Sequence, residues 1–145
     1  MVILGASVQM KLGGEKMNTA IEKEIVNAFV YRNRRERVLF EMGKREKRDD
    51  LLWQFERYLD PSYMHRIRTH IKDAEHLYRI LKEEGAENEC YVLADGRSYD
   101  DKIPLMRAIE ENLFRGPYFM LLGDGLAYFE SEPYVMSERY ILRKG

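Results

Sequence analysis

Three aspartates in the segment "ADGRSYDDK" are the residues best placed to do metal chemistry. Asp95, Asp100 and Asp101 follow the apolar run Cys90–Ala94, which has the pattern of a buried strand. In open α/β sheets, ligands bind at the carboxyl ends of the strands. Asp100-Asp101-Lys102 also fits the acidic-x-Lys half of a metal-dependent nuclease pattern.

The same segment has a simpler interpretation as a connecting loop. The upstream Pro-Asp that would complete the nuclease pattern is absent at a suitable distance. Asp95-Gly96 is typical of a turn, and Asp100 or Asp101 can cap the following helix. A metal-dependent hydrolase using Asp95, Asp100, Asp101 and His70 is therefore one hypothesis, and a structural loop is the other.

The histidines do not have the spacing of a metal site. His65 and His70 would lie on opposite faces of a strand. On a helix the same two residues would lie roughly 140° apart. His76 and Asp73 are three residues apart, but a metal site needs three or four ligands in a defined geometry. We therefore expect neither a metal nor a cofactor.

A small cationic patch is expected where Arg66, Arg68 and His70 share one strand face. Such a patch is suited to an anion. Ordinary exposed polar alternation explains the same pattern equally well.

The sequence lacks the common catalytic motifs. It contains no phosphate loop, no dinucleotide-binding glycine fingerprint, no nucleophile elbow and no His-Glu-x-x-His. The single cysteine, Cys90, excludes an intramolecular disulfide, and its apolar neighbours indicate a buried, inert thiol. A reducing, cytoplasmic setting fits this cysteine usage.

Positive charge is concentrated between Tyr31 and Asp50, although the whole chain has a formal net charge of -1. Residues 31–72 carry twelve basic and seven acidic side chains, a net charge of +5, whereas residues 73–145 carry nine and fifteen, a net charge of -6. The basic residues that we consider candidates for partner binding are Arg32, Arg34, Arg35, Arg37, Lys44, Arg45, Lys47 and Arg48. This asymmetry makes the basic segment the most informative feature of the sequence.

We predict a small non-enzymatic binding protein that engages a protein partner, or a second copy of itself, through the basic region 32–48. A nucleic-acid-associated protein using the same residues is the alternative, because Lys and Arg neutralise phosphates. Against it, Tyr31, Phe40, Trp53 and Phe55 have the pattern of core residues, and RNA-recognition and zinc-finger motifs are absent. A solvated face with interspersed acids would need no partner at all.

Apolar residues recur with helical spacing after Thr19, Asp49, Asp73 and Pro104. Asn18 or Thr19 can cap the first of these helices, and Glu22 would complete a capping box with Thr19. Strand-like runs are Val38–Phe40, "SYMHRI", "CYVLA", "YFMLL", "LAYFE" and "ERYIL". Gly123-Asp124-Gly125 predicts a hairpin between the fourth and fifth of these runs. "YFMLL" should be a central strand and "LAYFE" should lie nearer an edge.

This order of elements predicts a single α+β domain. We expect a mixed sheet of about five or six strands, about four helices and a C-terminal antiparallel meander. A mainly parallel α/β sheet with an antiparallel edge is the alternative. No apolar run approaches the roughly 20 residues that span a bilayer, so we expect no membrane partner.

The N-terminal residues 1–16 carry two interpretations. Gly13-Gly14-Glu15-Lys16 before Met17 is what a purine-rich ribosome-binding sequence would encode, which predicts initiation at Met17 and a leader at 1–16. The other interpretation is an extra strand at Val2 to Met10. The domain itself is then residues 17–145.

Overall fold

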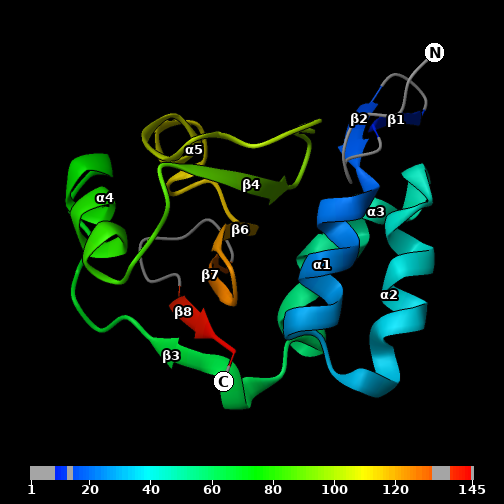
Figure 1. The fold of residues 1–145 in the computed structure, drawn as a ribbon, viewed down its shortest axis with the longest axis horizontal. Coiled ribbons are helices and arrows are strands. Elements are labelled where there is room, and N and C mark those ends of the chain that lie inside the picture. The colour runs from blue at the N-terminus through cyan, green and yellow to red at the C-terminus, as the bar shows by residue number, and fades with distance from the viewer. Residues whose placement is uncertain (1–8, 13–14, 132–137, 145) are drawn as a thin grey trace.

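The computed structural model describes residues 9–12, 15–131 and 138–144 (Figure 1). Within these residues the chain forms five α-helices: α1 (Thr19–Phe29), α2 (Arg35–Met42), α3 (Arg45–Trp53), α4 (Ala74–Glu83) and α5 (Leu105–Asn112). The strands of the main sheet are β3 (Met64–Arg66), β4 (Glu89–Ala94), β5 (Ile103–Pro104), β6 (Tyr118–Gly123), β7 (Leu126–Glu130) and β8 (Arg139–Arg143). A separate hairpin consists of β1 (Gln9–Leu12) and β2 (Glu15–Asn18).

The main sheet has the strand order β3-β8-β7-β6-β4-β5, and every pairing in it is antiparallel. The α+β class, the single domain and the C-terminal meander are therefore confirmed. The sheet is antiparallel throughout rather than mixed, because the connection through α4 places β4 away from β3 instead of beside it. No described helix has the length and apolar character needed to cross a membrane.

The hairpin between β6 and β7 forms as the Gly-Asp-Gly sequence predicts. Gly125 adopts a φ of 68°, a conformation that glycine enters without steric cost. β6 is an inner strand buried on both faces, as expected. β7, expected nearer an edge, is also an inner strand and is buried along its whole length, including Glu130.

The molecule has three layers, with α1, α2 and α3 on one face of the sheet and α4 and α5 on the other (Figure 1). Alternating side chains of the strands divide between the two faces. On the α1 face, the Phe119 ring lies 5.7 Å from Phe29 of α1 and 5.6 Å from Phe55. All three rings are fully buried and anchor the helical layer to the sheet.

The segment Val38–Phe40, predicted as a strand, is part of helix α2. In the helix Val38 and Met42 are four residues apart, so they share a face, and both are buried. Phe40 lies on the opposite side and is 58% exposed. The short apolar run fits both a strand and a helix locally, and packing against α1 and α3 selects the helix.

Helix α1 begins where the sequence predicts. The Asn18 side chain accepts a hydrogen bond from the Ile21 N–H and so caps the helix. Glu22, for which a capping-box contact with Thr19 was expected, accepts hydrogen bonds from Arg48 and Tyr91. Of the strand expected at Val2 to Met10, residues 1–8 lie outside the described residues, and residues 9 and 10 belong to β1.

Candidate functional site

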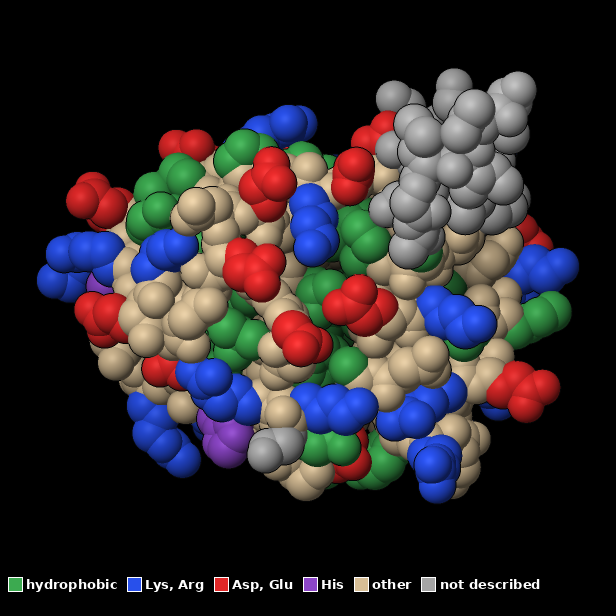
Figure 2. All heavy atoms as spheres, viewed as in Figure 1, with side chains coloured by type: hydrophobic (Ala, Val, Ile, Leu, Met, Phe, Trp, Pro, Cys, Tyr) green, Lys and Arg blue, Asp and Glu red, His purple; other side chains and the backbone are tan. Residues whose placement is uncertain are grey.

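The basic region 32–48 follows the outer side of the helical layer, from the turn before α2 to the start of α3. Figure 2 shows Lys and Arg side chains together with protruding hydrophobic side chains on this side of the molecule. Six of the eight candidate residues are exposed, and we call these six and Phe40 the basic surface: Arg32, Arg34, Arg37, Phe40, Lys44, Arg45 and Lys47.

Two of the predicted binding residues do not belong to this surface. Arg48 is only 8% exposed and points inward, where it forms an ion pair with Glu22. Arg35 is half-buried, and its Nε donates to the carbonyl oxygen of Val30 at 3.0 Å. Arg48 therefore belongs to the interior of the fold, whereas partner binding by the exposed candidates stays a prediction.

Phe40, which the sequence pattern placed in the core, is an exposed aromatic residue of this surface. The Lys44 and Lys47 ammonium nitrogens lie 5.1 and 5.9 Å from the centroid of its ring. Such distances permit cation–π attraction, which also holds the ring among positive charges. A helical interpretation of "RVLFEM" would have placed Phe40 outside, opposite Val38 and Met42.

Tyr31 and Trp53, expected in the core, are 38% and 45% exposed, whereas Phe55 is fully buried as expected. Trp53 donates from its indole nitrogen to Asp95 Oδ2 at 3.0 Å. Three of the four aromatic residues of this segment are thus accessible.

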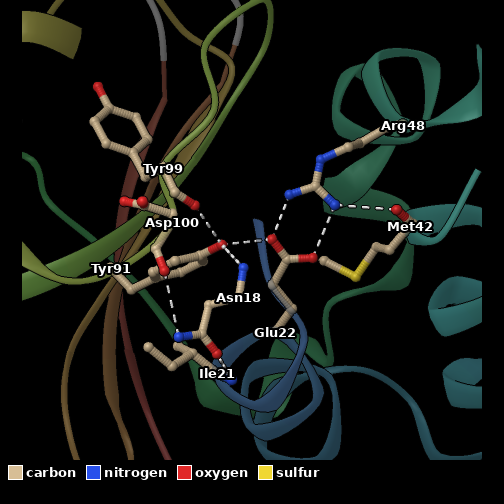
Figure 3. Close-up of polar contacts among 8 residues, drawn as sticks. All are labelled: Asn18, Ile21, Glu22, Met42, Arg48, Tyr91, Tyr99 and Asp100. Carbon is tan, nitrogen blue, oxygen red and sulfur yellow. Dashed lines mark hydrogen bonds and ion pairs between the residues drawn. The ribbon is translucent and has the colours of Figure 1, made fainter. Parts of the chain in front are cut away.

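A buried polar cluster joins the helical layer to the sheet (Figure 3). Arg48 Nη1 donates to Glu22 Oε1 at 2.8 Å and to the Met42 carbonyl oxygen at 3.0 Å, and its Nη2 donates to Glu22 Oε2. The Tyr91 hydroxyl of β4 lies 2.6 Å from Glu22 Oε2 and accepts from the Asn18 N–H at 3.0 Å. Burial, together with the neighbouring Glu22 carboxylate, holds the pKa of Tyr91 far above its usual range.

A cavity of about 270 Å³ lies between the start of α1 and the end of α2, with Glu22 in its lining. Its surface is mainly apolar, from Leu39 and Met42, and Thr19, Lys23 and Gly43 complete it. The carboxylate of Glu22 is already bound by Arg48 and Tyr91. We therefore interpret the cluster as a structural junction and not as a reactive site.

A second buried cluster lies at the end of the meander. Glu130 is fully buried, and its Oε1 accepts from the hydroxyls of Tyr118 and Tyr128 at 3.0 and 2.8 Å. Arg139 Nε donates to the same oxygen at 3.2 Å, and the Phe114 N–H donates to Oε2 at 2.9 Å. Burial raises the pKa of both tyrosines well above the ordinary value.

The aspartates of the segment 95–101 lie on the connection after β4, where two of them accept hydrogen bonds from neighbouring groups. Asp95 accepts from Trp53, as described above, and Asp101 Oδ1 accepts from the Lys102 N–H at 2.8 Å. Asp49 Oδ1 on α3 accepts from the Gly96 N–H at 3.2 Å and holds the turn against the helical layer. His70 is exposed on the connection between β3 and α4. Among the described residues, no three His, Cys, Asp or Glu side chains are placed to hold a metal ion.

Comparison of the chain with protein-family models, with characterised proteins and with solved structures finds no match. Any statement about function therefore depends on the surfaces and clusters described above.

Cys90 is expected to be unreactive in the folded protein. It is fully buried in β4, and burial raises the pKa of its thiol to about 12. A disulfide reagent added near pH 8 should leave the native protein unmodified and should titrate one thiol per chain in denaturant. Rapid labelling of the native protein would show that β4 opens to solvent.

Proposed function

We propose that this protein is a non-enzymatic binding protein whose basic surface engages an acidic surface on a protein partner or on a second copy of the chain. The observation that carries the proposal is the exposed Phe40 ring among Lys44, Lys47 and the neighbouring arginines. A large aromatic side chain at the centre of a contact contributes much of its binding energy, while surrounding charges speed association and select the partner.

The charges of this surface are available to a partner. Among the described residues, Arg32, Arg34, Lys44, Arg45 and Lys47 have no carboxylate within ion-pair distance. Arg37 is the exception, because its Nε lies 3.0 Å from Glu41 Oε2 in an exposed pair. A second copy is one source of acidic groups, since residues 73–145 carry a net charge of -6.

A nucleic-acid-associated function is the second candidate, and the same aromatic side chain favours it. Exposed aromatic rings beside lysines stack on unpaired bases while the ammonium groups contact phosphates. Phe40, Lys44 and Lys47 have this composition.

We expect the triple variant Phe40→Ala, Arg34→Glu, Lys47→Glu to lose self-association as measured by multi-angle light scattering. If the partner is another acidic protein, its affinity for the triple variant should fall at least tenfold. The melting temperature should stay nearly unchanged, because all three side chains are exposed. The double variant Lys102→Glu, Arg115→Glu changes exposed cations elsewhere and serves as the matched control.

Two results would contradict binding to a protein. If the triple variant keeps its mass in solution and its affinity for the partner, the basic surface does not take part in the interaction. Retention on single-stranded RNA with a steep salt dependence, lost in the triple variant, would instead support the nucleic-acid candidate.

A further inference from the structure

Helix α4 lies at the opposite end of the molecule from α2 (Figure 1), and a groove runs along it. The groove has a volume of about 410 Å³, within the range of small-molecule sites. The connection from β3 forms one side and one face of α4 forms the other. Its lining residues are Thr69, Lys72, Asp73, His76, Arg79, Ile80 and Glu83.

His76 is held so that it presents a hydrogen-bond donor. Its Nδ1 accepts from the Lys72 N–H at 3.1 Å. In the neutral imidazole the proton is therefore on Nε2, which makes that nitrogen a donor. The hydrogen bond also fixes the ring against the connection that forms the other side of the groove.

Two permanent cations line the same groove. Lys72 and Arg79 are exposed, and neither has a carboxylate within ion-pair distance among the described residues. Thr69 adds a hydroxyl group to these donors. Residues 65–79 hold four Arg and Lys, two acids and all three histidines of the chain, so the surroundings are also positive.

The two carboxylates of the groove define its polarity. Asp73 Oδ1 accepts from the His76 N–H at 2.8 Å and caps α4, so this oxygen is already satisfied. Glu83 is one turn beyond Arg79 and would repel an anion at that end. Ile80, which lies between Asp73 and Glu83 in the sequence, adds an apolar side chain to the lining of the groove.

We propose that this groove binds a small phosphomonoester, with the phosphate held by Thr69, Lys72, His76 and Arg79 and the organic part lying towards Ile80. A phosphate group has three terminal oxygens and close to two negative charges near neutral pH, so it can use donors from several side chains. A carboxylate has only two oxygens and one negative charge, so it would match this set of donors less well. Arg and Lys both favour phosphate, Arg through two parallel hydrogen bonds and Lys as a point charge.

Isothermal titration of the full chain with phenyl phosphate and with inorganic phosphate tests this proposal. Phenyl phosphate should bind saturably and more tightly than inorganic phosphate, because its ring contacts Ile80. The double variant Lys72→Gln, Arg79→Gln should lose at least about tenfold in affinity. Ile80→Ser should lower the affinity for phenyl phosphate more than the affinity for inorganic phosphate. Lys102→Gln, which removes an exposed cation distant in sequence, should bind like the wild type.

The absence of saturable binding at millimolar phenyl phosphate would overturn the proposal, as would unchanged affinity in the Lys72→Gln, Arg79→Gln variant. Equal affinity for phenyl phosphate and inorganic phosphate would overturn the proposal of a phosphomonoester ligand, because the groove would then bind only the free phosphate ion. Retained circular dichroism and melting temperature in the variants exclude misfolding as the cause of a loss, because the substituted cations are exposed.

Discussion

Replacement of Arg48 by methionine is expected to lower the free energy of unfolding by about 3–5 kcal/mol, the cost of removing one partner of a buried ion pair. Glu22 is only 3% exposed in the folded protein. In the variant its buried carboxylate loses both hydrogen bonds from the guanidinium group. It also leaves the Met42 carbonyl oxygen without the donor at 3.0 Å. Urea unfolding followed by circular dichroism measures the loss.

The double variant Glu22→Leu, Arg48→Met should recover most of this loss. An apolar pair of similar volume removes the uncompensated charge, and buried ion pairs replaced in this way are often neutral in stability. The Tyr91 hydroxyl keeps an acceptor in the Tyr99 carbonyl oxygen at 3.0 Å. Measured together, the two single variants and the double variant give the coupling energy of the pair.

Arg45→Met is the matched control, because Arg45 is exposed on the same helix and should change stability by less than about 0.5 kcal/mol. A loss for Arg48→Met as small as that of Arg45→Met would contradict a buried, charged junction between α3 and α1.

Stability is expected to fall steeply above about pH 10, with each of three buried tyrosines contributing about 1.4 kcal/mol per pH unit. Tyr91, Tyr118 and Tyr128 are fully buried, and burial is the main reason that the pKa of each lies above its ordinary value. Above about pH 10 the unfolded chain therefore loses three phenolic protons that the folded chain keeps. The unfolded state then binds fewer protons, so this part of the stability is complete below about pH 10 and is lost as the pH rises.

Urea unfolding at a series of alkaline pH values measures this slope, and Tyr128→Phe should reduce it by about 1.4 kcal/mol per pH unit. An alkaline slope that Tyr128→Phe does not alter would show that the hydroxyl titrates in the folded protein.

Local chemistry was enough to predict the helices at Thr19–Phe29 and Ala74–Glu83, each with a side-chain cap, and the hairpin at Gly123–Gly125. In these segments the periodicity is long, or the turn residues select a single conformation. Val38–Phe40 is too short for its periodicity to distinguish a strand from a helix. Because the segment was predicted as a strand, Phe40 was wrongly expected in the core. The antiparallel direction of β4 was also missed, because the pattern of a strand does not specify its neighbour.

The candidate surface shows the same division. The concentration of positive charge at residues 32–48 follows from the residue types and their spacing alone. The inward direction of Arg48, towards Glu22, which lies 26 positions earlier, arises from tertiary packing, whereas the neighbours of Arg48 remain exposed. Tertiary packing likewise brings Asn18 to Tyr91, 73 positions away. The pairing of two charges depends on which elements pack together, and packing is decided by the whole core rather than by any one segment.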